Sequence, residues 1–165
     1  MPFYVLYAQK QVGSIGTTLT ASSTAFLLAQ TTTNPLWGWV ADRRGFRVVF
    51  LASIALWAFA TLGLFGASDL LHFTAIFAGL GAGFGGFQMS AQNLVLEFGE
   101  RGDLPMRIAV ANSASELVGA IGPLLGGAIA AWSSYDSVFA LALAFQVAAM
   151  GIVLVGVEEP RTRPR

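Results

Sequence analysis

The sequence is poor in two kinds of residue, cysteine and charged side chains. It has no cysteine, which excludes disulfides and thiolate metal sites. Only 11% of its 165 residues are charged, whereas a soluble domain typically carries about 25%. Since 55% of the residues are hydrophobic, most of the surface cannot be meant for water, and we expect lipid to be the solvent.

Basic residues are too few and too clustered for a nucleic-acid-binding protein. The nine Lys and Arg are matched by nine Asp and Glu, so the formal net charge is zero. They gather in short turns instead of forming a phosphate-binding face. The single histidine, His72, has no second His with which to share a metal ion. We therefore expect no nucleic-acid partner, no metal site and no cofactor.

The few charges divide the chain into uncharged stretches that are long enough to cross a bilayer. A membrane helix needs about 20 apolar residues for a hydrocarbon core about 30 Å thick. Five spans of this length result, of which the fourth is interrupted by one charge, Glu116: residues 17–41, 46–66, 70–96, 106–132 and 136–157. The sequence therefore predicts an all-α, polytopic membrane helix bundle of five transmembrane helices, with residues 1–165 forming a single membrane domain. Met1–Ala8 is too short to cross and is expected to be the end of a helix whose beginning is missing.

The five predicted spans differ in polarity. Span 17–41 carries threonines at helical spacing together with Asn34, so it should face protein or a wet cavity. Pro35 is expected to kink this helix, with Thr31 placed to satisfy the carbonyl that the proline frees. Span 46–66 has almost no polar atoms and is predicted to face lipid nearly all round.

Glycines in two spans are spaced for close helix packing. In span 70–96, Gly79 and Gly83 form a small-xxx-small pair, and Gly81 and Gly85 form another. Span 106–132 contains a second cluster. Its predicted packing residues are Gly122, Pro123 and Gly126.

The cations indicate an orientation. Lys10 alone falls on one side of the predicted bundle, and the other eight cations, all arginines, fall on the opposite side. Cytoplasmic loops carry the excess of Lys and Arg. We therefore predict a multi-pass protein of the plasma (inner) membrane, with the amino terminus outside and the carboxyl terminus in the cytoplasm.

A short charged turn joins the first two spans, at residues 38–47. Gly38 would let the helix end approach a neighbouring backbone, Asp42 would lie against an arginine or a helix N-terminus, and Gly45 would permit the sharp turn. The cations that resist translocation are Arg43, Arg44 and Arg47. A purely topogenic basic loop, without a gating role, is the alternative.

The pattern G-x-x-x-D-R-x-G-x-R in this turn resembles the signature loop of the major facilitator superfamily. In that family the loop joins the second and third helices of a six-helix repeat. The resemblance implies that this chain holds the last five of twelve helices, with Gly38, Asp42, Arg43, Gly45 and Arg47 in the gating loop. The segment GPLLGG at 122–127 is similar to the end of an antiporter motif, but Val118 stands where that motif has glycine.

The resemblance also implies a function. Such a protein would carry a small molecule or ion across the bilayer by alternating access, and this chain would be an incomplete half. Its partner would be the missing N-terminal half, in the same chain or a separate one. The alternative is a membrane-embedded assembly subunit of a split or homo-oligomeric transporter that does not transport independently. The substrate, the direction of transport and the coupling ion stay open.

Glu116 is the one carboxylate inside a predicted span. It lies about nine residues beyond Arg107, which at 1.5 Å per residue places it roughly 14 Å from the membrane boundary. A carboxylate at that depth is costly, which suits proton coupling or cation binding. The alternative is a neutral helix contact with Asn112. Polar residues that could line a cavity beside Glu116 are Asn112, Gln88, Gln92, Thr31 and Asn34; each could instead bond a neighbouring helix.

The sequence gives little support to an enzyme. No cluster of His, Asp and Glu and no nucleophile with a base lies within the spans. Gly81, Gly83 and Gly86 match G-x-G-x-x-G, but a dinucleotide site needs alternating strands and helices, which a long uncharged run does not supply. We therefore expect no catalytic residues.

Overall fold

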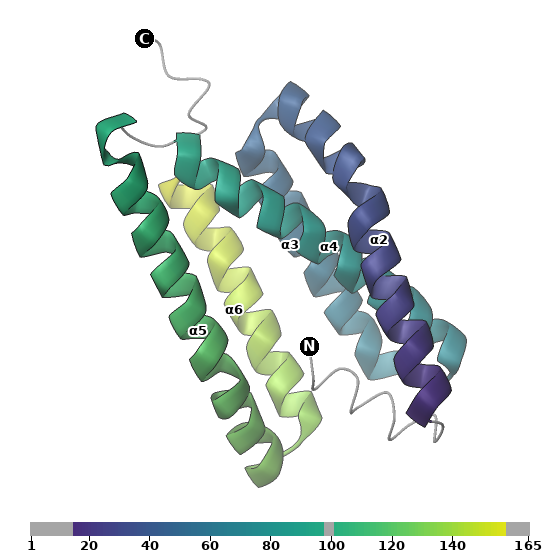
Figure 1. Cartoon of the computed structure of the whole chain (residues 1–165). Helices are drawn as coiled ribbons and strands as arrows, with labels where there is room; N and C mark the ends of the chain where they lie inside the picture. The colour runs from purple at the N-terminus through teal and green to yellow at the C-terminus, as the bar shows by residue number, and fades with distance from the viewer. Residues whose placement is uncertain (1–14, 98–100, 158–165) are drawn as a thin grey trace.

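The protein is a bundle of long helices (Figure 1). The computed structural model describes residues 15–97 and 101–157, and this part of the chain contains helices and no strand. The long helices are α2 (Ile15–Arg44), α3 (Phe46–Gly63), α4 (Leu70–Glu97), α5 (Leu104–Trp132) and α6 (Tyr135–Gly156), with short 3-10 turns η1 (Leu64–Gly66) and η2 (Arg101–Asp103). The predicted all-α bundle is confirmed. Met1–Ala8 and Lys10 lie outside the described residues.

Four of the described helical segments are long and apolar enough to cross a membrane: Phe46–Gly66, Leu70–Glu97, Leu104–Trp132 and Tyr135–Gly156. The remaining long helix, α2, has 30 residues, so its length suffices. Its threonines and amides lower its mean hydropathy, and composition alone therefore does not mark it as a span. Such a helix needs a face that is turned away from lipid.

Helix α4 lies between α2 and α3, and its glycines allow both neighbours to come close. A Cβ on Gly81 would overlap the carbonyl of Phe26 in α2. On the other side, a Cβ on Gly83 would lie 2.9 Å from the carbonyl oxygen of Ser53 in α3. Backbone atoms cannot rotate away, so only glycine fits these two positions.

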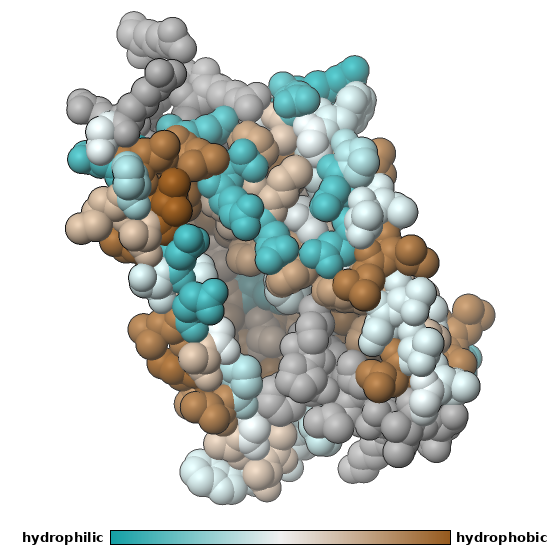
Figure 2. Space-filling model, viewed as in Figure 1, coloured by the Kyte–Doolittle hydropathy of each residue, from teal (hydrophilic) through white to brown (hydrophobic). Residues whose placement is uncertain are grey.

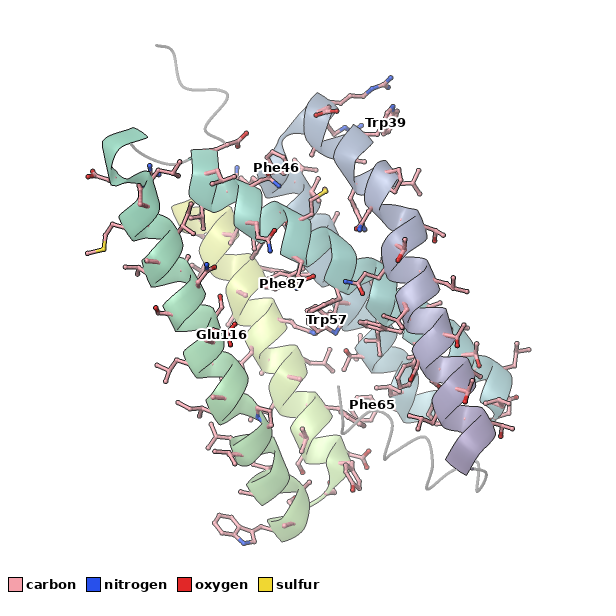
Figure 3. All side chains as sticks on the ribbon, viewed as in Figure 1. Trp39, Phe46, Trp57, Phe65, Phe87 and Glu116 are labelled. Carbon is pink, nitrogen blue, oxygen red and sulfur yellow. The ribbon has the colours of Figure 1, made fainter. Side chains whose placement is uncertain are left out.

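Aromatic rings fill the space around the glycine contacts. The ring of Phe84 in α4 lies 5.8 Å from Phe26 of α2 and 5.5 Å, edge-on, from Trp57 of α3. Phe87, one turn further along α4, also packs against Trp57, at 5.8 Å (Figure 3). Tilted and edge-to-face pairs at these distances are favourable. They join α2, α3 and α4 into one packed unit.

The prediction that α3 faces lipid nearly all round is wrong. Val49, Ser53, Ile54 and Thr61 are buried, and α3 contacts both α4 and α6. The two hydroxyls are tolerated inside because they bond to their own helix: Ser53 donates to the Phe50 carbonyl at 2.9 Å and Thr61 to the Trp57 carbonyl at 3.0 Å. A buried hydroxyl satisfied in this way needs no partner on another helix.

Helix α2 contains Pro35 in its interior. The C-terminal part of the helix is bent relative to the rest (Figure 1). The predicted role of Thr31 at this proline is wrong, because its hydroxyl donates to the Leu27 carbonyl at 2.9 Å. Thr32 and Thr33 make the same contact with the carbonyls of Leu28 and Ala29, at 2.8 and 2.7 Å. Hydroxyls that bond four residues back favour a bend in a helix.

Helices α5 and α6 are far less covered. Gly126 is the one buried residue of α5, and Phe139 is the one buried residue of α6. Phe139 belongs to a core cluster with Leu64, Phe73, Phe77 and Leu80. The bundle therefore has a tightly packed side, α2–α3–α4, and an open side, α5–α6.

Candidate functional site

Gly45 alone makes the turn between α2, which ends at Arg44, and α3, which begins at Phe46. Its φ is 84° and its ψ is 164°, a conformation that is essentially restricted to glycine. Its N–H donates to the Ala41 carbonyl at 2.8 Å, which ends the α2 ladder. The predicted signature loop is therefore one residue long, and the charged residues on both sides of it are helical.

Two arginines at this end of the bundle bond to the C-termini of other helices. Arg47 donates from Nη2 to the Leu154 carbonyl at 2.9 Å, in the last turn of α6. Arg107 donates from Nη1 to the Val95 carbonyl at 3.3 Å, in the last turn of α4. The last carbonyls of a helix lack partners within the helix and carry partial negative charge, so a guanidinium there is doubly favourable.

The remaining predicted loop residues have other surroundings. The guanidinium of Arg43 lies 4.0 Å above the Trp39 ring, and the Asp42 side chain is exposed. A Cβ on Gly38 would meet nothing within 4 Å. The predicted backbone approach at Gly38 is therefore made by no described residue of this chain, and it stays a prediction.

Polar side chains from α2, α4 and α5 gather on one face (Figure 2). Gln30 of α2 donates from Nε2 to Oε1 of Gln88 in α4, at 3.4 Å. Asn34 lies beside Gly85, since a Cβ added to Gly85 would be 2.9 Å from the Oδ1 atom of Asn34. We give the name polar band to seven exposed or half-exposed polar residues of these three helices: Gln30, Thr31, Asn34, Gln88, Gln92, Asn112 and Glu116.

Within the described residues, neither Glu116 nor Asn112 forms a side-chain hydrogen bond or ion pair. Both are exposed on α5, and Glu116 lies about halfway along that helix (Figure 3). The alternative of a neutral contact between them receives no support from this geometry. The other described charges lie close to helix ends, so Glu116 has no counter-charge at its own depth.

The predicted packing residues fall into two groups. A Cβ on Gly79 would lie 3.2 Å from Ala60 Cβ, and Gly83 lies against Ser53, so this pair faces α3. In α5, Gly126 is buried, Pro123 is exposed and a Cβ on Gly122 would meet nothing within 4 Å. Packing at Gly122 and Pro123 therefore stays a prediction.

A recess of about 420 Å³ lies where the end of α4 meets the beginning of α5. Its lining residues are Leu94, Val95, Met106, Arg107, Val110 and Ala111. It includes no residue of the polar band, which lies on an open face of this chain. No three His, Asp or Glu side chains of residues 15–97 and 101–157 gather as metal ligands.

The sequence did not identify two residues of α2 that contact α4, Trp37 and Gln30. Trp37 donates from Nε1 to the Ala82 carbonyl at 2.9 Å, and a Cβ on Gly86 would lie 2.7 Å from its ring. Gln30, bonded to Gln88, was not among the candidates. Its position four residues before Asn34 was the available signal, whereas nothing in the sequence distinguishes Trp37 from its neighbour Trp39.

Long apolar helices joined by an arginine-bearing turn define a multi-pass membrane protein. The family model of the Major Facilitator Superfamily matches residues 1–165, so the chain belongs to that superfamily of transmembrane transporters. Comparisons with curated proteins and with solved structures returned no match.

Proposed function

We propose that this chain is part of a secondary transporter that moves a small solute or ion by alternating access. The observation that carries the proposal is the polar band. It includes a carboxylate, Glu116, that lies halfway along a long apolar helix and has no charged partner among the residues that the structure describes. A charge at the bilayer centre costs about 2.5–3.5 kcal/mol by insertion measurements, so such a residue faces water or a polar partner.

The shape of the band supports a shared cavity. Its residues come from α2, α4 and α5, and the face that carries them is open in this chain. In alternating access, two bundles rock about a site at their interface, near the middle of the bilayer. We propose that this chain supplies the last five helices of such a protein and that a further half, in the same or a separate chain, covers the polar band.

The proposed orientation follows the arginines. Arg43, Arg44, Arg47 and Arg107 lie at the end where α2, α4 and α6 finish and where α3 and α5 begin. Placing this end in the cytoplasm puts the carboxyl terminus inside and the amino terminus outside. In this orientation the signature loop lies at the cytoplasmic mouth of the proposed pathway, where the arginines hold the ends of α4 and α6.

Uptake by the gene product that contains this chain tests the proposal. It would be reconstituted in liposomes and offered a panel of cationic, neutral and anionic solutes, with and without a proton gradient. Glu116→Gln is expected to abolish proton coupling or cation recognition. Asp103→Asn is the matched control, because the Asp103 side chain makes no cap hydrogen bond. Unchanged uptake and pH dependence in Glu116→Gln would remove this residue from the mechanism.

A second candidate is an assembly subunit without independent transport. It is favoured by α5, in which Gly126 alone is buried within this chain. The chain alone in liposomes is expected to carry no solute under either proposal. Co-reconstitution with a separately encoded half distinguishes the two proposals. Restored uptake supports the assembly subunit. Uptake by the chain without any partner would contradict both.

A further inference from the structure

Four arginines with described side chains lie at the signature-loop end, and they divide into two pairs. Arg47 and Arg107 point inward and bond to the carbonyls of Leu154 and Val95. Arg43 and Arg44 are exposed, and neither forms a hydrogen bond or ion pair with any residue that the structure describes. The inward pair has a structural task, whereas the outward pair offers its N–H groups to the surroundings.

Arg43 and Arg44 line a recess at the end of α2. Arg43 lies flat over the Trp39 ring, 4.0 Å from its centroid. These two residues, with Val40 and Arg44, line a recess of about 240 Å³. Trp39 is at the end of α2 and points away from the other helices (Figure 3). Stacking on an indole holds a guanidinium in place while leaving its edge free to bind oxygen in a bidentate manner.

An apolar track leads from this recess along α2. Leu28, Leu36 and Trp39 are 59%, 63% and 55% exposed. With Arg43 they follow helical spacing on one side of the helix. The exposed Thr32 lies between the two leucines, and its hydroxyl is bonded to the Leu28 carbonyl at 2.8 Å. From Leu28 to Arg43 the track is about 22 Å long at 1.5 Å per residue. One leaflet of the hydrocarbon core is about 15 Å deep, so the track covers the length of a lipid tail.

We propose that Trp39, Arg43 and Arg44 bind the phosphate of an anionic glycerophospholipid in the leaflet at the arginine-bearing end. Its acyl chain lies along Leu36 and Leu28. Two guanidinium groups match a phosphodiester whose charge is not cancelled by a headgroup cation, and the neighbouring carboxylate, Asp42, removes only part of this positive charge. The indole lies at the headgroup level, where tryptophan is enriched. Lipid binding at this site does not depend on which solute the protein carries.

Native mass spectrometry of the chain in detergent tests this site, with phosphatidylglycerol and phosphatidylcholine of identical acyl chains as probes. The wild-type chain is expected to retain phosphatidylglycerol preferentially. The variant R43Q/R44Q is expected to lose that preference, with affinity falling by about tenfold or more. The matched control R161Q/R163Q removes two cations that lie outside the described residues, and it is expected to change the affinity less than about twofold.

A second variant separates geometry from charge and protects the test against misfolding. Trp39→Leu keeps both cations and removes the ring that orients Arg43, and it is expected to weaken phosphatidylglycerol binding by about threefold. Helix content by circular dichroism is measured for every variant. Equal binding of the two lipids, an equal loss in R161Q/R163Q, or unchanged binding in Trp39→Leu would each overturn the proposal. Displacement by soluble glycerol 3-phosphate at equal concentration would also overturn it, since a free-phosphate site would need no acyl track.

Discussion

The two sides of the bundle are held together by different means. On the α2–α3–α4 side, glycines of α4 let backbones touch and aromatic rings fill the rest of the space. On the α5–α6 side, little is buried, and two arginine–carbonyl bonds connect helix ends to their neighbours. The α2–α3–α4 side is therefore a closely packed unit that tolerates few changes, whereas the α5–α6 side leaves its surfaces for lipid or for a partner.

Adding one methyl group to a glycine on each side is expected to give the largest difference. In Gly81→Ala, the new Cβ overlaps the Phe26 carbonyl, and overpacking of this kind costs about 1–3 kcal/mol or more. In Gly122→Ala of α5, nothing lies within 4 Å, and the change is expected to be neutral or stabilising by up to about 1 kcal/mol. Thermal unfolding in detergent, followed by circular dichroism, measures both. Equal shifts in the two variants would contradict the packed-side account.

The turn between α2 and α3 is expected to give the next effect. Gly45→Ala forces a Cβ into a backbone conformation with φ 84° and ψ 164°, at a cost of about 1–3 kcal/mol. The control is Gly38→Ala in the same loop motif, where the added Cβ would meet nothing within 4 Å of this chain. The same unfolding measurement applies. If Gly38→Ala proves the more damaging in the isolated chain, the description of the turn is wrong.

On the open side, the arginine contacts offer a local test. Arg47→Gln removes the charged donor to the Leu154 carbonyl and is expected to cost about 1–2 kcal/mol. The expected signature is faster amide hydrogen exchange in the last turn of α6. Arg43→Gln, four residues earlier, leaves the Leu154 contact intact and should leave that exchange unchanged. Similar protection in both variants would argue against Arg47 as the residue that holds α6.

The smallest effect is expected at the hydrogen bond between α2 and α4. Trp37→Phe keeps a ring beside Gly86 but deletes the Nε1 donor to the Ala82 carbonyl, at a cost of about 0.5–1.5 kcal/mol. Trp132→Phe is the control, since Trp132 is 89% exposed. A loss of stability in Trp132→Phe as large as in Trp37→Phe would contradict a specific role for the Trp37 bond.

Much of the fold could be predicted because charges are excluded from the bilayer. Every predicted span boundary lies within three residues of a helical boundary in the structure, since the charged turns mark where helices leave the membrane. The break at Gly45 was also readable, because only glycine among its neighbours tolerates that turn. The buried face of α3 could not be predicted. The hydroxyls of Ser53 and Thr61 bond to carbonyls of α3 itself, so they need no polar partner on another helix.

Partners distant in the sequence could not be predicted. Gly79 and Gly122 both belong to small-residue motifs, yet a Cβ would contact Ala60 at Gly79 and meet nothing at Gly122. Periodicity shows which residues share a face but not which helix covers that face. The bond from Arg47 to the Leu154 carbonyl, 107 residues apart, depends on the packing of the whole bundle. For the same reason, the polar band could be listed as candidates but not assembled.

The most direct test of the central claim is whether the polar band faces water in a bilayer. The chain has no cysteine, so single substitutions can be labelled without background. Gln92→Cys and Asn112→Cys lie in the band, whereas Phe145→Cys and Ile152→Cys replace exposed apolar residues of α6. A charged, membrane-impermeant thiol reagent needs a hydrated thiolate, so we predict at least about tenfold faster labelling of the two band positions in a reconstituted bilayer. Equal or reversed rates would contradict a water-filled pathway lined by α2, α4 and α5.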